Sequence, residues 1–189
     1  MNSYFTEAGV FLINVIFGFY ILMVMLRLML QLVRADFHNP VSQFLVKITS
    51  PALKPLRRFV PGVAGIDMSA IVLLLVLKFT EQLLTFLLVG SGVHIGALIL
   101  ISITGLISLA LYIYIIGIFV QVIFSWIQPG GSNPIIILLH QITEPVMRPV
   151  RRMLPPFSGL DLSPLLAIIV LQLIVMAIPH LQRTMLNLF

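Results

Sequence analysis

The chain has 189 residues, of which 60% are hydrophobic and 9% are charged, with 11 Lys and Arg against 6 Asp and Glu. A soluble globular domain is about half apolar and roughly one quarter charged, so this composition excludes a soluble protein and predicts an integral membrane protein. The sequence contains no cysteine, which excludes disulfides, cysteine metal ligands and thiol catalysis.

The first apolar segment covers residues 10–32. About 20 helical residues cross a hydrocarbon core that is about 30 Å thick, so this segment is long enough for one span. Arg27 lies near its end, where a long basic side chain can reach the headgroups. Residues 1–8 contain Glu7 but no Lys or Arg. Because a cleavable signal peptide starts with a basic region, we expect this span to be retained.

A segment rich in proline and arginine follows the first span. Val41, Phe44, Leu45 and Ile48 have the i, i+3, i+4, i+7 spacing of one apolar helix face, which predicts a short amphipathic helix in the membrane interface. Proline interrupts the hydrogen bonds of a helix interior, so we expect a proline-jointed basic segment after this helix. Its prolines are Pro51, Pro55 and Pro61.

The second apolar span is predicted at residues 68–89. Ser69 can cap its first turn, and Asp67 places a negative charge near the positive end of the helix dipole. The linker at residues 90–94 then separates this span from the next apolar segment.

The segment from the amphipathic helix to the second span occurs twice, and every matched pair is 94 residues apart (Asp67 and Asp161, for example). The first copy contains Thr49, Pro51, Pro55, Arg57, Arg58, Pro61, Gly65, Asp67 and Ser69. The second contains Thr143, Pro145, Pro149, Arg151, Arg152, Pro155, Gly159, Asp161 and Ser163. Such a period sets the architecture, so the chain is a tandem duplication with repeats at residues 1–94 and 95–189.

The offset places the remaining spans at residues 104–126 and 162–178. The third apolar segment starts earlier, at Ile95, so residues 95–103 are extra helical turns, a tilted extension or an interfacial piece. We expect the last span to end before Pro179. The second amphipathic helix is more apolar than the first, and its residues 135–139 either lie on the bilayer or dip into it as a re-entrant segment.

Lysine and arginine collect in the two repeated loops and are absent from residues 1–9 and 90–94. The positive-inside rule therefore predicts that both repeated loops lie in the cytoplasm and that both termini lie outside it. The expected fold is all-α and integral to the membrane: four transmembrane helices in two tandem parallel repeats, each with a cytoplasmic amphipathic helix and a Pro/Arg loop.

Each repeated loop carries three basic residues at i, i+3, i+4 spacing, which projects them to one side of a helical turn. They are Lys54, Arg57 and Arg58 in the first repeat, and Arg148, Arg151 and Arg152 in the second. One interpretation is a binding surface for anionic lipid headgroups, a site for another anion, or a docking surface for a partner protein. The alternative is that these bases only hold the loop in the cytoplasm and pair with Asp67 or Asp161. Nucleic acid is not an expected partner.

Repetition of the proline framework indicates a loop of fixed shape rather than a disordered basic tail. The residues expected to hold this shape are Pro51, Pro55, Asp67 and Ser69, together with Pro145, Pro149, Asp161 and Ser163. Because a bundle of four spans buries little surface, we also expect a homo-oligomer or a larger membrane complex.

Lys78 and Glu81 lie three residues apart in the middle of the second span. Charges inside a membrane commonly pair and mark ion or proton pathways, but a mutually neutralised pair can equally join two helices. Their counterparts are Gln172 and Val175, which argues against a symmetric two-fold pore. No catalytic, cofactor-binding or metal-binding pattern is recognised, so we expect a non-enzymatic protein without a cofactor.

The repeated pattern Thr-x-Pro-x-x-x-Pro-x-Arg-Arg-x-x-Pro, followed by Gly-x-Asp-x-Ser and an apolar span, resembles the signature of the YggT (YlmG) family, in its two-copy proteobacterial form. The resemblance implies a small inner-membrane protein that contributes to osmotic and potassium homeostasis, directly as a pore or indirectly. It also implies an alternative, a scaffold or assembly factor for division or a membrane complex. Such a factor would dock its partner on the duplicated Arg-Arg loops.

Overall fold

The computed structural model describes residues 3–63, 65–90, 92, 94–127, 133–154 and 161–186; Pro155 and Gly159 of the second motif lie outside these ranges. The elements of the described part are all α-helices, which confirms the predicted fold class. They are α1 (Ser3–Leu32), α2 (Pro40–Leu56), α3 (Met68–Val89), α4 (Ile95–Ile127), α5 (Pro134–Met153) and α6 (Ser163–Leu186).

Four of these helices, α1, α3, α4 and α6, are long and apolar enough to cross a membrane, with mean hydropathy between 2.0 and 2.5. Most of their surface is not covered by other parts of the chain, and large apolar side chains such as Phe11, Ile16 and Leu173 are more than half exposed. Contiguous apolar surface of this extent is unfavourable in water and is solvated by lipid. The chain is therefore a multi-pass membrane protein.

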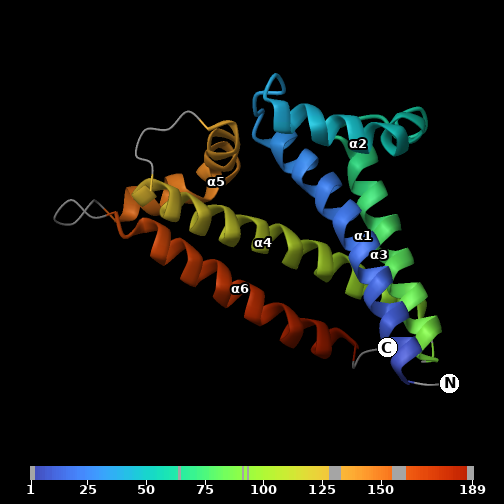
Figure 1. Ribbon diagram of the computed structural model, residues 1–189. Coiled ribbons are helices and arrows are strands. Elements are labelled where there is room, and N and C mark those ends of the chain that lie inside the picture. Colours follow the sequence, from blue (N-terminus) through green and yellow to red (C-terminus); the bar gives the residue numbers. More distant parts are fainter. Residues whose placement is uncertain are drawn as a thin grey trace.

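The spans pack as two pairs, α1 with α3 and α4 with α6, and the pairs meet along α3 and α4. Figure 1 shows α2 and α5 at the same end of the molecule, and the start of α1 and the end of α6 at the opposite end. The two repeats therefore run in the same direction, as the tandem duplication predicts.

The helices extend beyond the predicted span boundaries at three places, and the first of these is the start of α1 at Ser3 instead of residue 10. Residues 95–103 are part of α4, so the extra residues continue the helix. The predicted end of the last span before Pro179 is wrong, because α6 continues through Pro179 to Leu186. A proline removes only one N–H from a helix, and helices that cross membranes tolerate this loss when neighbouring groups satisfy the freed carbonyl.

Asparagine followed by proline starts both amphipathic helices. The side chain of Asn39 accepts a hydrogen bond of 2.9 Å from the backbone N–H of Val41, and Asn133 accepts one of 2.9 Å from Ile135. The proline that follows each asparagine occupies the first helical turn, where its missing N–H costs nothing. The segment 135–139 is therefore part of one continuous helix, α5.

The expectation that prolines separate the amphipathic helix from the basic segment is wrong. Pro51 and Pro55 lie inside α2, and Pro145 and Pro149 lie inside α5. In each helix the two prolines are four residues apart, so they share one face, and this face is exposed. The carbonyls that lose their N–H partners therefore face water or headgroups, which can hydrogen-bond them, and the helix persists.

Candidate functional site

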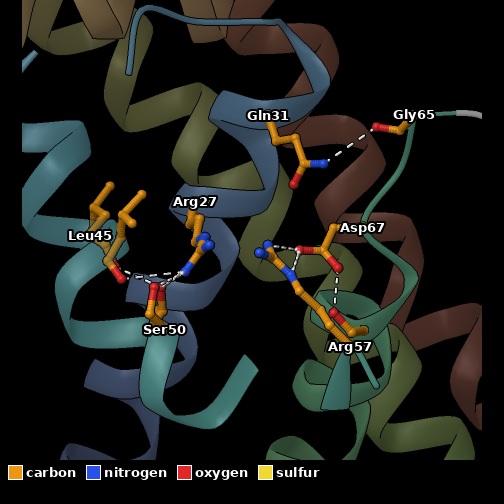
Figure 2. Close-up of polar contacts among 10 residues, drawn as sticks. Arg27, Gln31, Leu45, Ser50, Arg57, Gly65 and Asp67 are labelled. Atoms are coloured by element: carbon orange, nitrogen blue, oxygen red, sulfur yellow. Dashed lines mark hydrogen bonds and ion pairs between the residues drawn. The ribbon is translucent and has the colours of Figure 1, made fainter. Parts of the chain in front are cut away.

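A buried arginine joins the first span to the first amphipathic helix. Nη1 of Arg27 donates to Oγ1 of Thr49 at 2.6 Å, and it lies 3.3 Å from Oγ of Ser50 and 3.4 Å from the carbonyl of Val46. The Thr49 hydroxyl in turn donates to the carbonyl of Leu45 at 2.6 Å. Figure 2 shows Arg27 reaching across from α1 to these groups of α2. Arg27 is 6% exposed and Thr49 is fully buried, so this contact holds α2 against α1.

The second repeat makes the same contact with a neutral donor. Nε2 of Gln121 on α4 donates to Oγ1 of Thr143 on α5 at 2.5 Å, and this hydroxyl donates to the carbonyl of Leu139 at 2.9 Å. Gly117 permits the approach, since a Cβ at this position would lie 3.1 Å from Cγ2 of Thr143. The repeated threonine therefore connects the amphipathic helix to the preceding span in both repeats.

An ion pair ties the end of α2 to the start of α3. Nε of Arg57 donates to Oδ2 of Asp67 at 3.1 Å, Nη2 of Arg57 donates to the same oxygen, and the Ser69 hydroxyl donates to Oδ1 (Figure 2). The Asp67 side chain is only 7% exposed. Burial alone would raise the pKa of Asp67, but the hydrogen bonds from Arg57 and Ser69 outweigh it, so the pKa lies below its ordinary value.

The equivalent ion pair of the second repeat, between Arg151 and Asp161, has a longer distance between its charged atoms. Nε of Arg151 lies 3.5 Å from Oδ2 of Asp161, and Nη1 of Arg151 donates to Glu144 at 3.1 Å. The backbone N–H of Ser163 donates to Asp161 at 2.9 Å. Burial raises the pKa of Asp161, but hydrogen bonding from Ser163 and the charge of Arg151 bring it below the ordinary value. Each arginine thus pairs within its own repeat. We call these two sites the first junction (Arg27, Thr49, Arg57, Asp67) and the second junction (Gln121, Thr143, Arg151, Asp161).

One basic residue of each loop therefore forms an ion pair while staying partly exposed, with 45% of the Arg57 side chain and 38% of the Arg151 side chain accessible. Arg57 and Arg151 turn to carboxylates of their own repeat, as the second interpretation of these bases predicts. The other four are exposed at the end of the molecule that carries α2 and α5: Lys54, Arg58, Arg148 and Arg152.

The two repeats also contact each other where the amphipathic helices begin. Nδ2 of Asn39, next to α2, donates to the carbonyl of Pro134 at the start of α5 at 2.9 Å. The backbone N–H of Asp36 donates to Oε1 of Gln141 at 3.4 Å. The asparagine that caps α2 thus lies at the boundary between the repeats.

The intramembrane charges Lys78 and Glu81 form an ion pair on α3. Nζ of Lys78 lies 2.9 and 2.8 Å from the two carboxylate oxygens of Glu81, whose side chain is 5% exposed. A Cβ at Gly105 would lie 3.0 Å from Cε of Lys78, so this glycine lets the lysine pass α4. A cavity of about 270 Å³ adjoins the lysine and is lined by Gly18, Ile21, Lys78, Gly105, Leu106, Ser108, Leu109 and Tyr112.

Sequence reasoning placed Arg27 among residues that reach the headgroups and did not connect it with Thr49. The signal that reveals the contact is the repeat itself, because Arg27 and Thr49 are separated by the same 22 positions as Gln121 and Thr143. Two polar positions that keep their spacing in both copies are candidates for mutual contact.

Comparisons with known proteins agree with this duplicated architecture. The CCB3/YggT family matches the chain twice, at residues 6–88 and 100–182, which are 94 residues apart at both ends. The uncharacterized protein PA0392 of Pseudomonas aeruginosa is 43% identical over 173 residues, covering 90% of this chain and 88% of the relative. An uncharacterized protein of Vibrio alginolyticus is 40% identical over 170 residues, covering 86% of this chain and 88% of the relative.

The uncharacterized protein YggT of Escherichia coli K12 is 35% identical over 178 residues, covering 92% of this chain and 91% of the relative. No solved structure matches the chain. Two matches to one family, and relatives that align over nearly the whole length, show that the chain belongs to the CCB3/YggT family.

Proposed function

We propose that this protein is a non-enzymatic membrane scaffold. In this proposal α2 and α5 form one fixed surface, at the cytoplasmic end of an inner-membrane protein with periplasmic termini. The surface docks a partner protein of negative charge on Lys54, Arg58, Arg148 and Arg152. The observation that carries the proposal is that both repeats hold their amphipathic helix to their own spans with the same two contacts, at the repeated threonine and at the repeated arginine.

These contacts support docking better than simple adhesion to lipid. A helix that only lies on a bilayer needs an apolar face and a polar face, and it gains nothing from buried polar contacts to the spans. Buried polar groups are costly unless they are hydrogen-bonded, so each junction specifies one orientation of its helix. The contact of Asn39 with Pro134 joins the two helices. Fixed charges of one sign favour rapid and specific association with a complementary surface.

Crosslinking and affinity purification of a charge-reversed protein tests this proposal. The variant Arg58→Glu/Arg152→Glu removes one exposed base from each repeat and leaves both junctions intact. The matched control is Arg34→Glu/Arg183→Glu, which changes the net charge equally through two exposed bases that do not belong to the proposed docking surface. Because the chain has no cysteine, labelling of single introduced cysteines checks that both variants keep their topology. We expect only the first variant to lose bound proteins, and unchanged partners in both variants would overturn the proposal.

A second candidate function, which we propose on a different observation, is a direct role in potassium or osmotic homeostasis. It is favoured by the Lys78–Glu81 pair and the adjoining cavity, since intramembrane charges beside a cavity are typical of ion pathways. Potassium flux into liposomes tests this role, with Lys78→Gln/Glu81→Val as the variant, because it copies the residues of the second repeat. Flux that is absent, or that the variant leaves unchanged, would exclude a pore that uses this pair.

A further inference from the structure

The first and second junctions differ in charge at two positions. Where the first repeat has Arg27, the second has Gln121, and where the first has Ser50, the second has Glu144. The first junction thus holds two guanidinium groups against the single carboxylate of Asp67. The second holds Arg151 against the carboxylates of both Asp161 and Glu144.

In the second junction a second carboxylate, that of Glu144, binds the arginine beside Asp161. Nη1 of Arg151 donates to Glu144 at 3.1 Å, while its Nε faces Asp161. At the first junction Nε and Nη2 of Arg57 are both taken by Asp67. Its Nη1 has no hydrogen-bond partner among the described residues, because Ser50 stands where the second repeat has its glutamate.

Arg27 adds a second guanidinium to the first junction, in contact with Ser50 of α2. Its Nη1 makes its hydrogen bonds to α2, while Nε and Nη2 make none within the described part of the chain. Arg27 lies within electrostatic reach of both Arg57 and Asp67. In the view of Figure 2 the guanidinium groups of Arg27 and Arg57 both lie between α2 and the chain that leads to α3. A buried guanidinium with no carboxylate in contact is unfavourable, so this arrangement favours an added anion.

We propose that the first junction binds the phosphate group of an anionic phospholipid, in the position that the Glu144 carboxylate occupies in the second junction. Guanidinium groups bind phosphate oxygens through paired N–H donors, and the hydroxyl of Ser50 offers one more. Arg27 projects from a membrane span near its end, at the depth where headgroups lie, and this position selects a lipid phosphate rather than a soluble one. The second junction does not bind lipid in this way, because the carboxylate of Glu144 already occupies the position beside Arg151.

Native mass spectrometry of the full-length, delipidated protein titrated with phosphatidylglycerol tests this site. The variants Arg27→Gln and Ser50→Glu each copy the second repeat, which folds with these residues, so we expect both to fold. Each should weaken the tightest phosphatidylglycerol binding by about tenfold or more, the loss expected for a hydrogen bond between charged groups. The matched controls are Lys47→Gln and Gln43→Glu, which make the same charge changes at exposed positions of α2. We expect each control to change binding by less than about threefold.

Two further measurements, a titration with phosphatidylcholine and a competition with inorganic phosphate, identify the ligand. Phosphatidylcholine, which carries no net charge, should bind weakly to every variant, and millimolar inorganic phosphate should not displace phosphatidylglycerol. Equal weakening in the junction variants and the controls would overturn the site, and displacement by inorganic phosphate would overturn the assignment to a lipid. The site is independent of partner docking, which we assign to other residues, so either proposal can fail alone.

Discussion

The side chain of Arg27 donates to the hydroxyl of Thr49 at 2.6 Å, and this bond joins a membrane span to an amphipathic helix that lies across its end. Gln121 and Thr143 form the same bond at 2.5 Å in the second repeat. The threonine hydroxyl is the common element, because it accepts from the span and donates to the backbone of its own helix in both places. The structure therefore keeps the contact while the donor changes from a charged to a neutral side chain.

Replacing each threonine singly by valine should show that the contact with Arg27 contributes more to stability than the contact with Gln121. Thr49→Val leaves Arg27 buried without its main acceptor, whereas Thr143→Val leaves only a neutral amide. A hydrogen bond to a charged group contributes about 1.5–3 kcal/mol and a neutral one about 0.5–1.5 kcal/mol. We expect Thr49→Val to lower the midpoint of thermal unfolding more than Thr143→Val in the same detergent. Equal effects would show that the charge of Arg27 adds nothing to the contact.

The adjacent arginines Arg57 and Arg58 should behave differently. Arg57→Gln removes the ion pair of a carboxylate that is 7% exposed, so the loss should be about 1–3 kcal/mol, the cost of leaving a buried acceptor unsatisfied. Arg58→Gln changes an exposed side chain and should alter stability by less than about 0.5 kcal/mol. Denaturant unfolding of both variants measures the difference. If Arg58→Gln is the more destabilising change, the pairing of Arg57 with Asp67 does not hold the loop.

Acid should weaken the first junction through Asp67. The pKa of this carboxyl is lower in the folded protein than its ordinary value of 3.8. Its contribution to stability is therefore complete above that ordinary value, and it is lost as the pH falls through the lowered pKa of the folded state. Asp67→Asn should lower the unfolding midpoint at pH 7 and flatten its decline below pH of about 4.

Asp161→Asn serves as the comparison for this pH profile. Its pKa is lowered as well, but its side chain is 47% exposed, so the ion pair with Arg151 is screened by solvent. We expect a smaller change at pH 7 and a smaller flattening at acid pH. An identical pair of profiles would contradict the stronger role given to Asp67.

The Lys78–Glu81 pair should tolerate joint replacement better than single replacement. Glu81→Val leaves an ammonium group in an apolar site, and removing one partner of a buried pair costs roughly 3–5 kcal/mol. Lys78→Gln/Glu81→Val copies Gln172 and Val175 of the second repeat and leaves no unpaired charge, so it should be close to neutral. Expression and unfolding midpoint of the single and double variants measure this. A double variant as unstable as the single one would contradict the pairing.

Much of the fold follows from the sequence because a membrane limits the choices. The four spans and the direction of the repeats could be predicted from apolar segment lengths and from the offset of 94 residues that relates Asp67 to Asp161. The helix through Pro51 and Pro55 could not be predicted. Whether a helix tolerates proline depends on which face the freed carbonyls occupy, and this face is set by packing against α1.

The junctions were only partly predictable. Pairing of the basic loop with Asp67 and Asp161 was one of two interpretations, and the sequence could not decide which arginine of each pair binds the carboxylate. Arg57 and Arg58 are adjacent and chemically identical, and only the end of α2 directs the first to Asp67 and the second outward. The contact of Arg27 with Thr49 depends on how α2 packs across α1, and this packing cannot be predicted from a local sequence pattern.

Photo-crosslinking from single cysteines in native membranes tests the central claim most directly, since the chain has no cysteine of its own. Arg58→Cys and Arg152→Cys place the probe on the proposed docking surface, and Arg57→Cys and Arg151→Cys place it one residue away, where the native side chain pairs with a carboxylate of its own repeat. We predict crosslinks to one partner protein from positions 58 and 152, and far fewer from positions 57 and 151. Equal crosslinking from all four positions, or none from 58 and 152, would contradict a scaffold that presents one residue of each arginine pair.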